Sequence, residues 1–408
     1  MKAIIKFQLS FMMFLQFFIW GGWFVTMGIY LPNTLEASGI ETAHAYSSQA
    51  WGAIIAPFII GLIADRYFNA ERVLAILHLI GAFLMYQMAN ATDFLVFVPY
   101  VFGYMIAYMP TLALVNSVSF NQMKDPSKEF AFVRVFGTIG WIVAGLAISY
   151  FGWDSEQGIA DGLLRNTFLM VAIASAVLAL FSMFLPKTPP KVNKDKIASF
   201  SDIIGLDALR LLKDKNFLVF FLASILISIP LGFYYQHAGQ FLGEIGAANP
   251  AAKMSIGQAS EVLFMLLLPF FFRKFGFKKT ILVGMLAWLV RYLLFAYGNS
   301  GELAFMLIIG IALHGICYDF FFVSGQIYTD TKAGEKHKSA AQGLITLATY
   351  GLGMLIGFAV AGIITDANLI AENEHNWARI WQFPAFFALG VALLFSLWFK
   401  NEKIEYKD

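Results

Sequence analysis

Twelve long apolar runs are the feature that most restricts what this chain can fold into. A helix that crosses the roughly 30 Å hydrocarbon layer of a membrane needs about 20 mostly apolar residues. The runs reach about that length and lie at about 7–30, 46–65, 72–90, 94–121, 130–151, 163–185, 216–242, 255–272, 279–298, 302–328, 339–364 and 378–399. Transmembrane strands would instead give alternating segments of about ten residues. The sequence therefore predicts an all-α integral membrane protein with twelve transmembrane helices.

The composition supports a membrane protein and gives no sign of an enzyme. Charged residues make up only 13% of the 408 positions, whereas soluble domains carry about 25%. The first apolar run is too long for the core of a signal peptide, so we expect it to be retained. Cys317 is the only cysteine and offers no disulfide framework. Since neither HExxH nor GxSxG occurs in the sequence, we expect no catalytic site, no metal and no cofactor.

The distribution of Lys and Arg predicts the orientation and the domains. Most of the 28 basic residues lie in alternate connections, on the side that includes both termini. Because cytoplasmic loops carry an excess of Lys and Arg, both termini are expected in the cytoplasm. The net charge of +2 mostly reflects this bias, so no nucleic-acid partner is inferred. We expect an N-terminal six-helix bundle at residues 1–185, a cytoplasmic linker at 186–215 with a short amphipathic helix capped by Ser201, and a C-terminal six-helix bundle at 216–408.

One polar connection resembles a known motif. The segment "GLIADRYFNAERVL" resembles the signature loop of the major facilitator superfamily, with its key positions occupied by Gly61, Asp65, Arg66 and Arg72. Phe68 and Asn69 stand where a glycine usually follows the first basic residue, so the match is imperfect. The resemblance implies a gating loop, in which a charge at a helix end holds one conformation. The alternative interpretation is an ordinary cytoplasmic loop.

A closer resemblance extends over nearly the whole chain. It rests on the segments "LQFFIWGGWFVTMGIYL", "YMPTLALVNSVSF", "VRVFGTIGW", "GQASEVLF", "VRYLLFAYG", "YDFFFVSGQ" and "AAQGLITLATYGLG", which occur in this order. Together they resemble the bacterial nucleoside:proton symporter family of the same superfamily. The resemblance implies two six-helix bundles that import a nucleoside, such as uridine or adenosine, together with protons by alternating access across the bacterial cytoplasmic membrane. It implies no cofactor and no obligate protein partner.

Charged residues inside the apolar runs are candidates for function, because each costs at least about 2.5–3.5 kcal/mol at the bilayer centre on insertion scales. Arg134, Glu261, Arg291 and Asp319 are the main ones. Helical spacing also groups polar and aromatic side chains on shared faces: Arg134 with Thr138 and Trp141, Gln258 with Glu261, and His314 with Tyr318. These groups supply the hydrogen-bond donors, acceptors and aromatic faces that a base joined to a sugar requires.

The family resemblance implies substrate contacts at Arg134, Thr138, Trp141, Gln258, Glu261, His314, Tyr318 and Asp319, with Tyr235 and Gln236 matched more loosely. Trp141 and Tyr318 stand where this family often has Phe, and His314 stands where it often has Tyr. Stacking survives these exchanges, whereas hydrogen bonding to the sugar can change. The preference between purines and pyrimidines is therefore left open.

Each polar residue also has a structural interpretation. Arg134 could extend to the inner membrane interface, and Arg291 is interpreted as structural. Glu261 and Asp319 are too short to reach an interface from mid-span, which favours a functional role. We assign the proton to Asp319 and mainly substrate binding to Glu261, although the two can titrate as one coupled unit. A proton-coupled sugar or polyol symporter, or a membrane sensor without transport activity, remains as an alternative.

Overall fold

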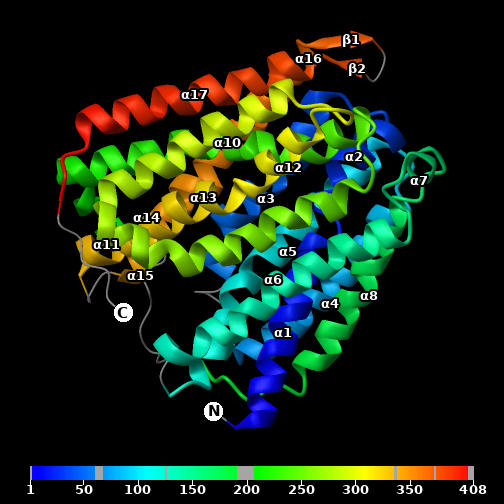
Figure 1. Cartoon of the computed structure of the whole chain (residues 1–408). Helices are drawn as coiled ribbons and strands as arrows, with labels where there is room; N and C mark the ends of the chain where they lie inside the picture. The colour runs from blue at the N-terminus through cyan, green and yellow to red at the C-terminus, as the bar shows by residue number, and fades with distance from the viewer. Residues whose placement is uncertain are drawn as a thin grey trace. The chain divides into compact units, whose positions relative to one another are not determined.

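The structure of the chain is a computed structural model that describes residues 2–59, 68–124, 126–190, 206–334, 338–371 and 374–402. The chain divides into two compact units. Unit 1 comprises Met1–Ser199 and Ala248–Ala252, and unit 2 comprises Phe200–Ala247 and Lys253–Asp408. The described parts of both units are almost entirely helical (Figure 1).

Unit 1 contains the helices α1 (Ala3–Gly21), α2 (Met27–Thr34), α3 (Gly39–Ile59), α4 (Ala70–Ala89), α5 (Phe94–Asn121), α6 (Pro126–Tyr150), α7 (Glu156–Ala160) and α8 (Arg165–Ser182). Its main packing pairs are α1 with α6, α4 with α5 and α8, and α3 with α5. Small residues let helix backbones approach closely inside a membrane. At Gly140 of α6, an added Cβ would lie 2.1 Å from the carbonyl oxygen of Phe14 in α1. Gly21 of α1 and Gly137 of α6 also meet the partner helix within 3 Å of an added Cβ, so the three glycines together allow the close spacing of the α1–α6 pair.

Unit 2 contains η2 (Leu206–Lys213), α10 (Lys215–Glu244), α11 (Pro250–Tyr297) except for its first residues up to Ala252, α12 (Ala304–Ala312), α13 (His314–Tyr318), η3 (Asp319–Val323), α14 (Ser324–Ala333), α15 (Lys338–Thr346), η4 (Leu347–Gly353), α16 (Met354–Asp366), β1 (Leu369–Ala371), β2 (Glu374–His375) and α17 (Trp377–Trp398). The strands β1 and β2 form a small antiparallel pair. Helix α10 packs against α16, α17 and η4. The segments η3 and η4 are π-helical, with one wider turn each inside a longer helix.

The helices differ from the predicted runs in two places where glycine occurs. The run 7–30 is broken, because α1 ends at Gly21 and a turn precedes α2. Gly22 follows Gly21, and two successive residues without side chains weaken a helix. The runs 255–272 and 279–298 both lie within α11, which bends at Gly276, where φ is +74°. Ser201, expected to cap a helix in the linker, lies outside the described residues, and η2 is a 3-10 helix.

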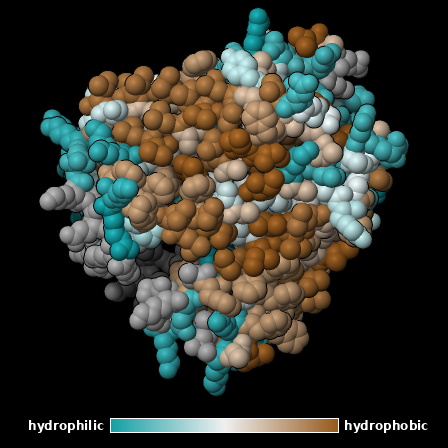
Figure 2. Space-filling view, in the orientation of Figure 1, coloured by the Kyte–Doolittle hydropathy of each residue, from teal (hydrophilic) through white to brown (hydrophobic). Residues whose placement is uncertain are grey.

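Large apolar side chains are exposed along the helices of both units. Leu95 is 80% exposed, Leu266 is 75% exposed and Leu397 is 76% exposed. Figure 2 shows that apolar residues cover much of the visible face. Among the described residues, ten helices are long and apolar enough to cross a membrane, when the continuous stretches Ala304–Ala333 and Ala340–Asp366 each count as one helix. A surface of this kind suits contact with lipid rather than with water.

Candidate functional site

In unit 1, Arg134, Thr138 and Trp141 lie half-buried on α6, on the shared face that their spacing predicts. The Arg134 guanidinium lies over the ring of Phe17 from α1, with 4.1 Å between Cζ and the ring centroid. A Cβ added at Gly137 would come within 2.8 Å of Arg134 Nη1, so the glycine leaves room for this side chain. Arg134 therefore packs as a cation against an aromatic face.

An aromatic wall that the sequence did not predict continues from Trp141. The Trp141 ring lies 5.6 Å from that of Trp20 in α1, and Trp20 lies 5.7 Å from Tyr108 in α5. A Cβ at Gly21 would come within 2.7 Å of the Trp141 ring, so this glycine allows the contact. We call Trp20, Tyr108 and Trp141 the aromatic wall of unit 1. Trp20 and Trp141 are half-buried and offer flat apolar faces on which a nucleobase can stack, whereas Tyr108 is buried behind Trp20.

A buried hydrogen-bond network holds this wall in place. The Gln16 amide donates to Thr111 Oγ1 at 2.7 Å, and His78 Nε2 lies 2.9 Å from Gln16 Oε1. The Tyr108 hydroxyl donates to the carbonyl oxygen of Gln16 at 2.7 Å. These contacts join α1, α4 and α5. Gln49 of α3 is also fully buried, and neither end of its amide has a partner among the described residues. A buried amide in that state is a further candidate for a polar ligand.

In unit 2, close packing of α11 on α13 brings two predicted residues together. Ser260 Oγ donates to the carbonyl oxygen of Ala312 at 2.6 Å and accepts from the Gly315 N–H at 2.9 Å. A Cβ at Gly315 would lie 2.5 Å from the Ser260 carbonyl oxygen, so only glycine permits this approach. The adjacent residues Glu261 and His314 consequently face each other, with 3.8 Å between Glu261 Oε2 and His314 Nε2.

His314 also contacts a buried cation. Arg291 has no exposed surface, and its Nη1 lies 2.9 Å from His314 Nδ1. The Arg291 guanidinium lies over the Tyr234 ring, 3.6 Å from the centroid, and His314 stacks on the same ring at 5.1 Å. The sequence led us to interpret Arg291 as structural. Its contact with a candidate site residue is visible only in the structure. The structure thus forms a row from Arg291 through His314 to Glu261.

Asp319 opens the π-helical segment η3 and is fully buried. Neither carboxyl oxygen has a hydrogen-bond partner among the residues that the structure describes. Phe320 and Phe321 follow it and are buried as well. A buried ionised carboxyl without a partner is very unfavourable, so such groups mark sites where a proton or ligand is bound. π-helical turns of this kind occur frequently at functional sites.

The remaining predicted residues of unit 2 lie on α10, α11 and α13. Tyr235, Gln258 and Tyr318 are half-buried, and Gln236 is fully buried. The Tyr318 hydroxyl forms a short hydrogen bond with the hydroxyl of Tyr350, which lies in η4. Tyr350 was missed in the sequence because it is one aromatic residue among many in an apolar run. It extends the polar surface around Tyr318 to a further segment.

The predicted gating loop is mostly not described. Gly61, Asp65 and Arg66 lie outside the described residues, and Arg72 lies exposed in the first turn of α4. Beside it, the buried Glu71 accepts a hydrogen bond of 2.9 Å from the Thr188 backbone N–H. Glu71 therefore connects the start of α4 to the segment that follows α8.

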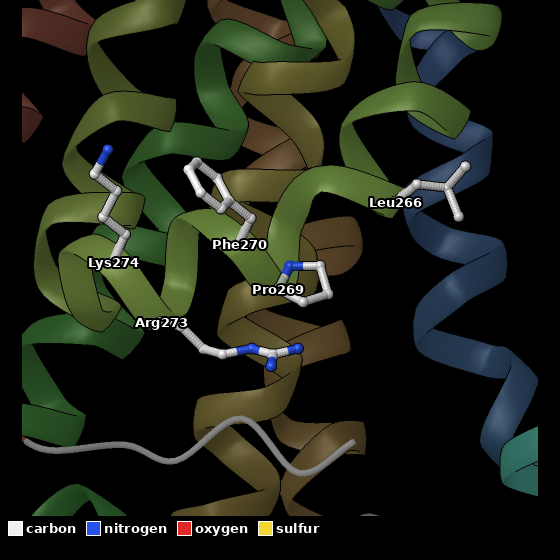
Figure 3. A pocket seen from close by; sticks show the side chains of 5 residues that line it. All are labelled: Leu266, Pro269, Phe270, Arg273 and Lys274. Carbon is white, nitrogen blue, oxygen red and sulfur yellow. The ribbon is translucent and has the colours of Figure 1, made fainter.

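A hollow on unit 2 is separate from the predicted site residues. Its lining consists of Leu266, Pro269, Phe270, Arg273 and Lys274, all from α11 (Figure 3). Among the described residues, no three His, Cys, Asp or Glu side chains group together as a metal site.

Comparison with known proteins identifies close relatives. The family model described as nucleoside H+ symporter matches residues 2–404. The Escherichia coli K12 protein YegT is 42% identical over 407 residues, which cover 98% of this chain and 94% of YegT. Nucleoside permease NupG of the same strain is 31% identical, over 98% of this chain and 97% of NupG. A crystal structure of nucleoside transporter NupG superposes with a TM-score of 0.87 at 30% identity, covering 98% of this chain and 100% of that chain.

The match in sequence extends along both units, and the match in fold does the same. The long apolar helices agree with a protein that crosses the membrane several times. The chain belongs to the nucleoside H+ symporter family and is a multi-pass protein of the bacterial inner membrane.

Proposed function

We propose that this chain imports nucleosides by alternating access, with a proton carried on Asp319. The observation that carries the proposal is the buried carboxyl of Asp319, which has no hydrogen-bond partner among the described residues. Nucleosides are neutral, so their accumulation needs a coupled ion. A proton that moves inward gains about 2.3 kcal/mol per 100 mV of membrane potential. A carboxyl that alternates between charged and neutral forms can transfer that energy to the substrate.

The substrate contacts follow from the side chains that each unit presents. In unit 1 these are Arg134, Thr138 and Trp141, and in unit 2 they are Tyr235, Gln236, Gln258, Glu261, His314, Tyr318 and Asp319. Aromatic rings at Trp141 and Tyr318 suit the base, while the amides and Glu261 suit the sugar hydroxyl groups. Relatives named nucleoside permease and xanthosine permease support a nucleoside over a bare sugar.

We infer twelve spans with both termini in the cytoplasm; the long helices support the spans, and the distribution of Lys and Arg supports the orientation. Ten described helices are long enough to cross the membrane, and one of them, α11, covers two predicted runs. Helix α3 covers the start of another predicted run. We infer the bundles at 1–185 and 216–408, joined by the linker at 186–215. Gly61, Asp65, Arg66 and Arg72 are proposed to act in gating.

Uptake of radiolabelled uridine into membrane vesicles tests the proposed function. Uptake should exceed the equilibrium level when a proton gradient is imposed and fall to that level when the gradient is removed. Uptake of a sugar in place of uridine would point to a polyol symporter. Binding without any uptake would point to a sensor.

A further inference from the structure

Arg291 is a buried cation in α11 whose contacts lead to the candidate site. It has no exposed surface, and its Nη1 lies 2.9 Å from His314 Nδ1. A guanidinium carries donors only and is always protonated. The His314 Nδ1 atom must therefore be the acceptor, which leaves it without a proton. His314 is then a neutral imidazole whose single ring N–H is on Nε2.

The Nε2 atom lies on the side of the ring that faces Glu261. The distance from Nε2 to Glu261 Oε2 is 3.8 Å, so a shift of about 1 Å would form a hydrogen bond. The imidazole cannot rotate freely, because it stacks on Tyr234 at 5.1 Å with an angle of 26° between the rings. A Cβ at Gly257 would come within 3.2 Å of His314 Cβ, so α11 also confines the base of the side chain.

We propose that Arg291 is a positioning residue for proton coupling: it fixes the tautomer of His314 so that the Nε2–H is presented to Glu261. This inference rests on the proposed function and deepens it. The row supplies a cation and a donor on the side of Glu261, which stabilises the carboxylate of that residue. Asp319 has no such partner among the described residues. The two carboxyls thereby take different roles, with Glu261 held charged and Asp319 left to exchange the proton.

The surroundings of His314 contain few other groups that could set its tautomer. The titratable and charged residues near it are Arg291 and Glu261 of α11, Tyr234 of α10, and Cys317, Tyr318 and Asp319, which follow it in the chain. Within the described part of the chain, the hydrogen bond at His314 Nδ1 is the one from Arg291. We therefore attribute the tautomer of His314 to this contact with Arg291.

Nitrogen-15 NMR of the full chain labelled at its histidines measures the tautomer directly. The chain has 6 His residues, and a His314→Gln variant assigns the relevant signal. The expected spectrum shows a neutral His314 with the proton on Nε2, and Arg291→Met should abolish this single form. A proton on Nδ1, or an imidazolium in the unsubstituted protein, would overturn the inference. The measurement does not depend on transport, so it remains decisive even if uridine is not the substrate.

Transport assays then separate positioning from a structural role. In Arg291→Met, gradient-driven uridine uptake should fall about tenfold or more, the effect of losing a hydrogen bond to a charged group, whereas Arg291→Lys keeps a cationic donor and should lose less. The pH dependence of uptake should also change, while uridine exchange without a gradient is retained. Equal loss of uptake and exchange in both variants would mean that Arg291 only supports the fold.

His237→Gln is the matched control, because His237 is equally buried but bonds to the neutral side chains of Gln240 and Thr365. It should leave the pH dependence unchanged.

Discussion

Arg134 stacks its guanidinium on the ring of Phe17, 4.1 Å from Cζ to the centroid. The planar group can keep this contact and still bind a ligand with its free edge, whereas the ammonium of lysine has no flat face. Arg134→Lys should therefore weaken uridine binding by about 1–3 kcal/mol, although the charge is kept. Calorimetry on the purified variants measures this. Arg165→Lys is the control, because Arg165 is exposed at the start of α8, and it should bind as the unsubstituted protein does.

Trp20 occupies the centre of the aromatic wall of unit 1, between Trp141 and Tyr108. Stacking of a base on an aromatic side chain is worth about 1–3 kcal/mol when measured by alanine substitution. We expect Trp20→Ala to lower the affinity for uridine by that amount and Trp20→Phe to lower it less. Trp51→Ala, at a residue of α3 that is 43% exposed, serves as the control. Unchanged affinity in Trp20→Ala would remove this wall from the binding site.

At the scale of residues, the sequence could predict groups on one helix but not contacts between helices. Arg134, Thr138 and Trp141 share a face because helical spacing determines it. Trp20 and Tyr350 could not be singled out, because 17% of the chain is aromatic and their partners lie on other segments. For the same reason, the contact between Arg291 and His314 could not be seen in the sequence.

Among the elements, the α1–α6 pair depends on several glycines, of which Gly140 makes the closest approach. A Cβ at Gly140 would lie 2.1 Å from the carbonyl oxygen of Phe14, so alanine would force the two backbones apart. Overpacking typically costs about 1–3 kcal/mol. Gly140→Ala should therefore lower the melting temperature of the protein in detergent. Gly390→Ala in α17 provides the control, because no atom lies within 4 Å of its added Cβ. Equal melting temperatures for the two variants would contradict the close contact.

The first turn of α11, which belongs to unit 1 up to Ala252, is held by Ser149 of α6 and by Asp154 in the connection that follows. The Asp154 carboxylate accepts from the Ala251 N–H at 2.8 Å, and Ser149 Oγ accepts from the Ala252 N–H at 3.1 Å. The N–H groups in the first turn of a helix have no acceptor within the helix and need such partners, and losing one costs about 0.5–2 kcal/mol. We expect Asp154→Ala to destabilise the protein by about that amount in thermal unfolding. Asp161→Ala, at an exposed aspartate after α7, should have no effect of this size.

The position and length of a helix could be predicted where hydropathy determines them. Long apolar runs gave the positions of the main helices, because burial in lipid requires such runs. The break after Gly21 and the bend at Gly276 depend on local backbone freedom, which a hydropathy pattern does not contain. The π-helical turns that begin at Asp319 and Leu347 likewise leave no sign in a hydropathy pattern.

For the whole molecule, the family resemblance seen in the sequence is confirmed by the match over residues 2–404. The assignment of the proton to one carboxyl stays a prediction, because the sequence offers both Glu261 and Asp319 as candidates. The surroundings of the two groups differ in the structure. Glu261 faces the imidazole of His314, while Asp319 is buried without a partner among the described residues. This difference favours Asp319 as the group that gains and loses the proton.

Substrate-induced proton movement in proteoliposomes tests the central claim most directly. Addition of uridine should make the outside medium more alkaline with the unsubstituted protein, because each imported nucleoside carries a proton with it. Asp319→Asn mimics the protonated form, so it should retain uridine exchange but lose both the alkalinisation and the accumulation. Glu261→Gln should keep a weakened signal. If Asp319→Asn still moves protons and concentrates uridine against its gradient, Asp319 is not the proton carrier.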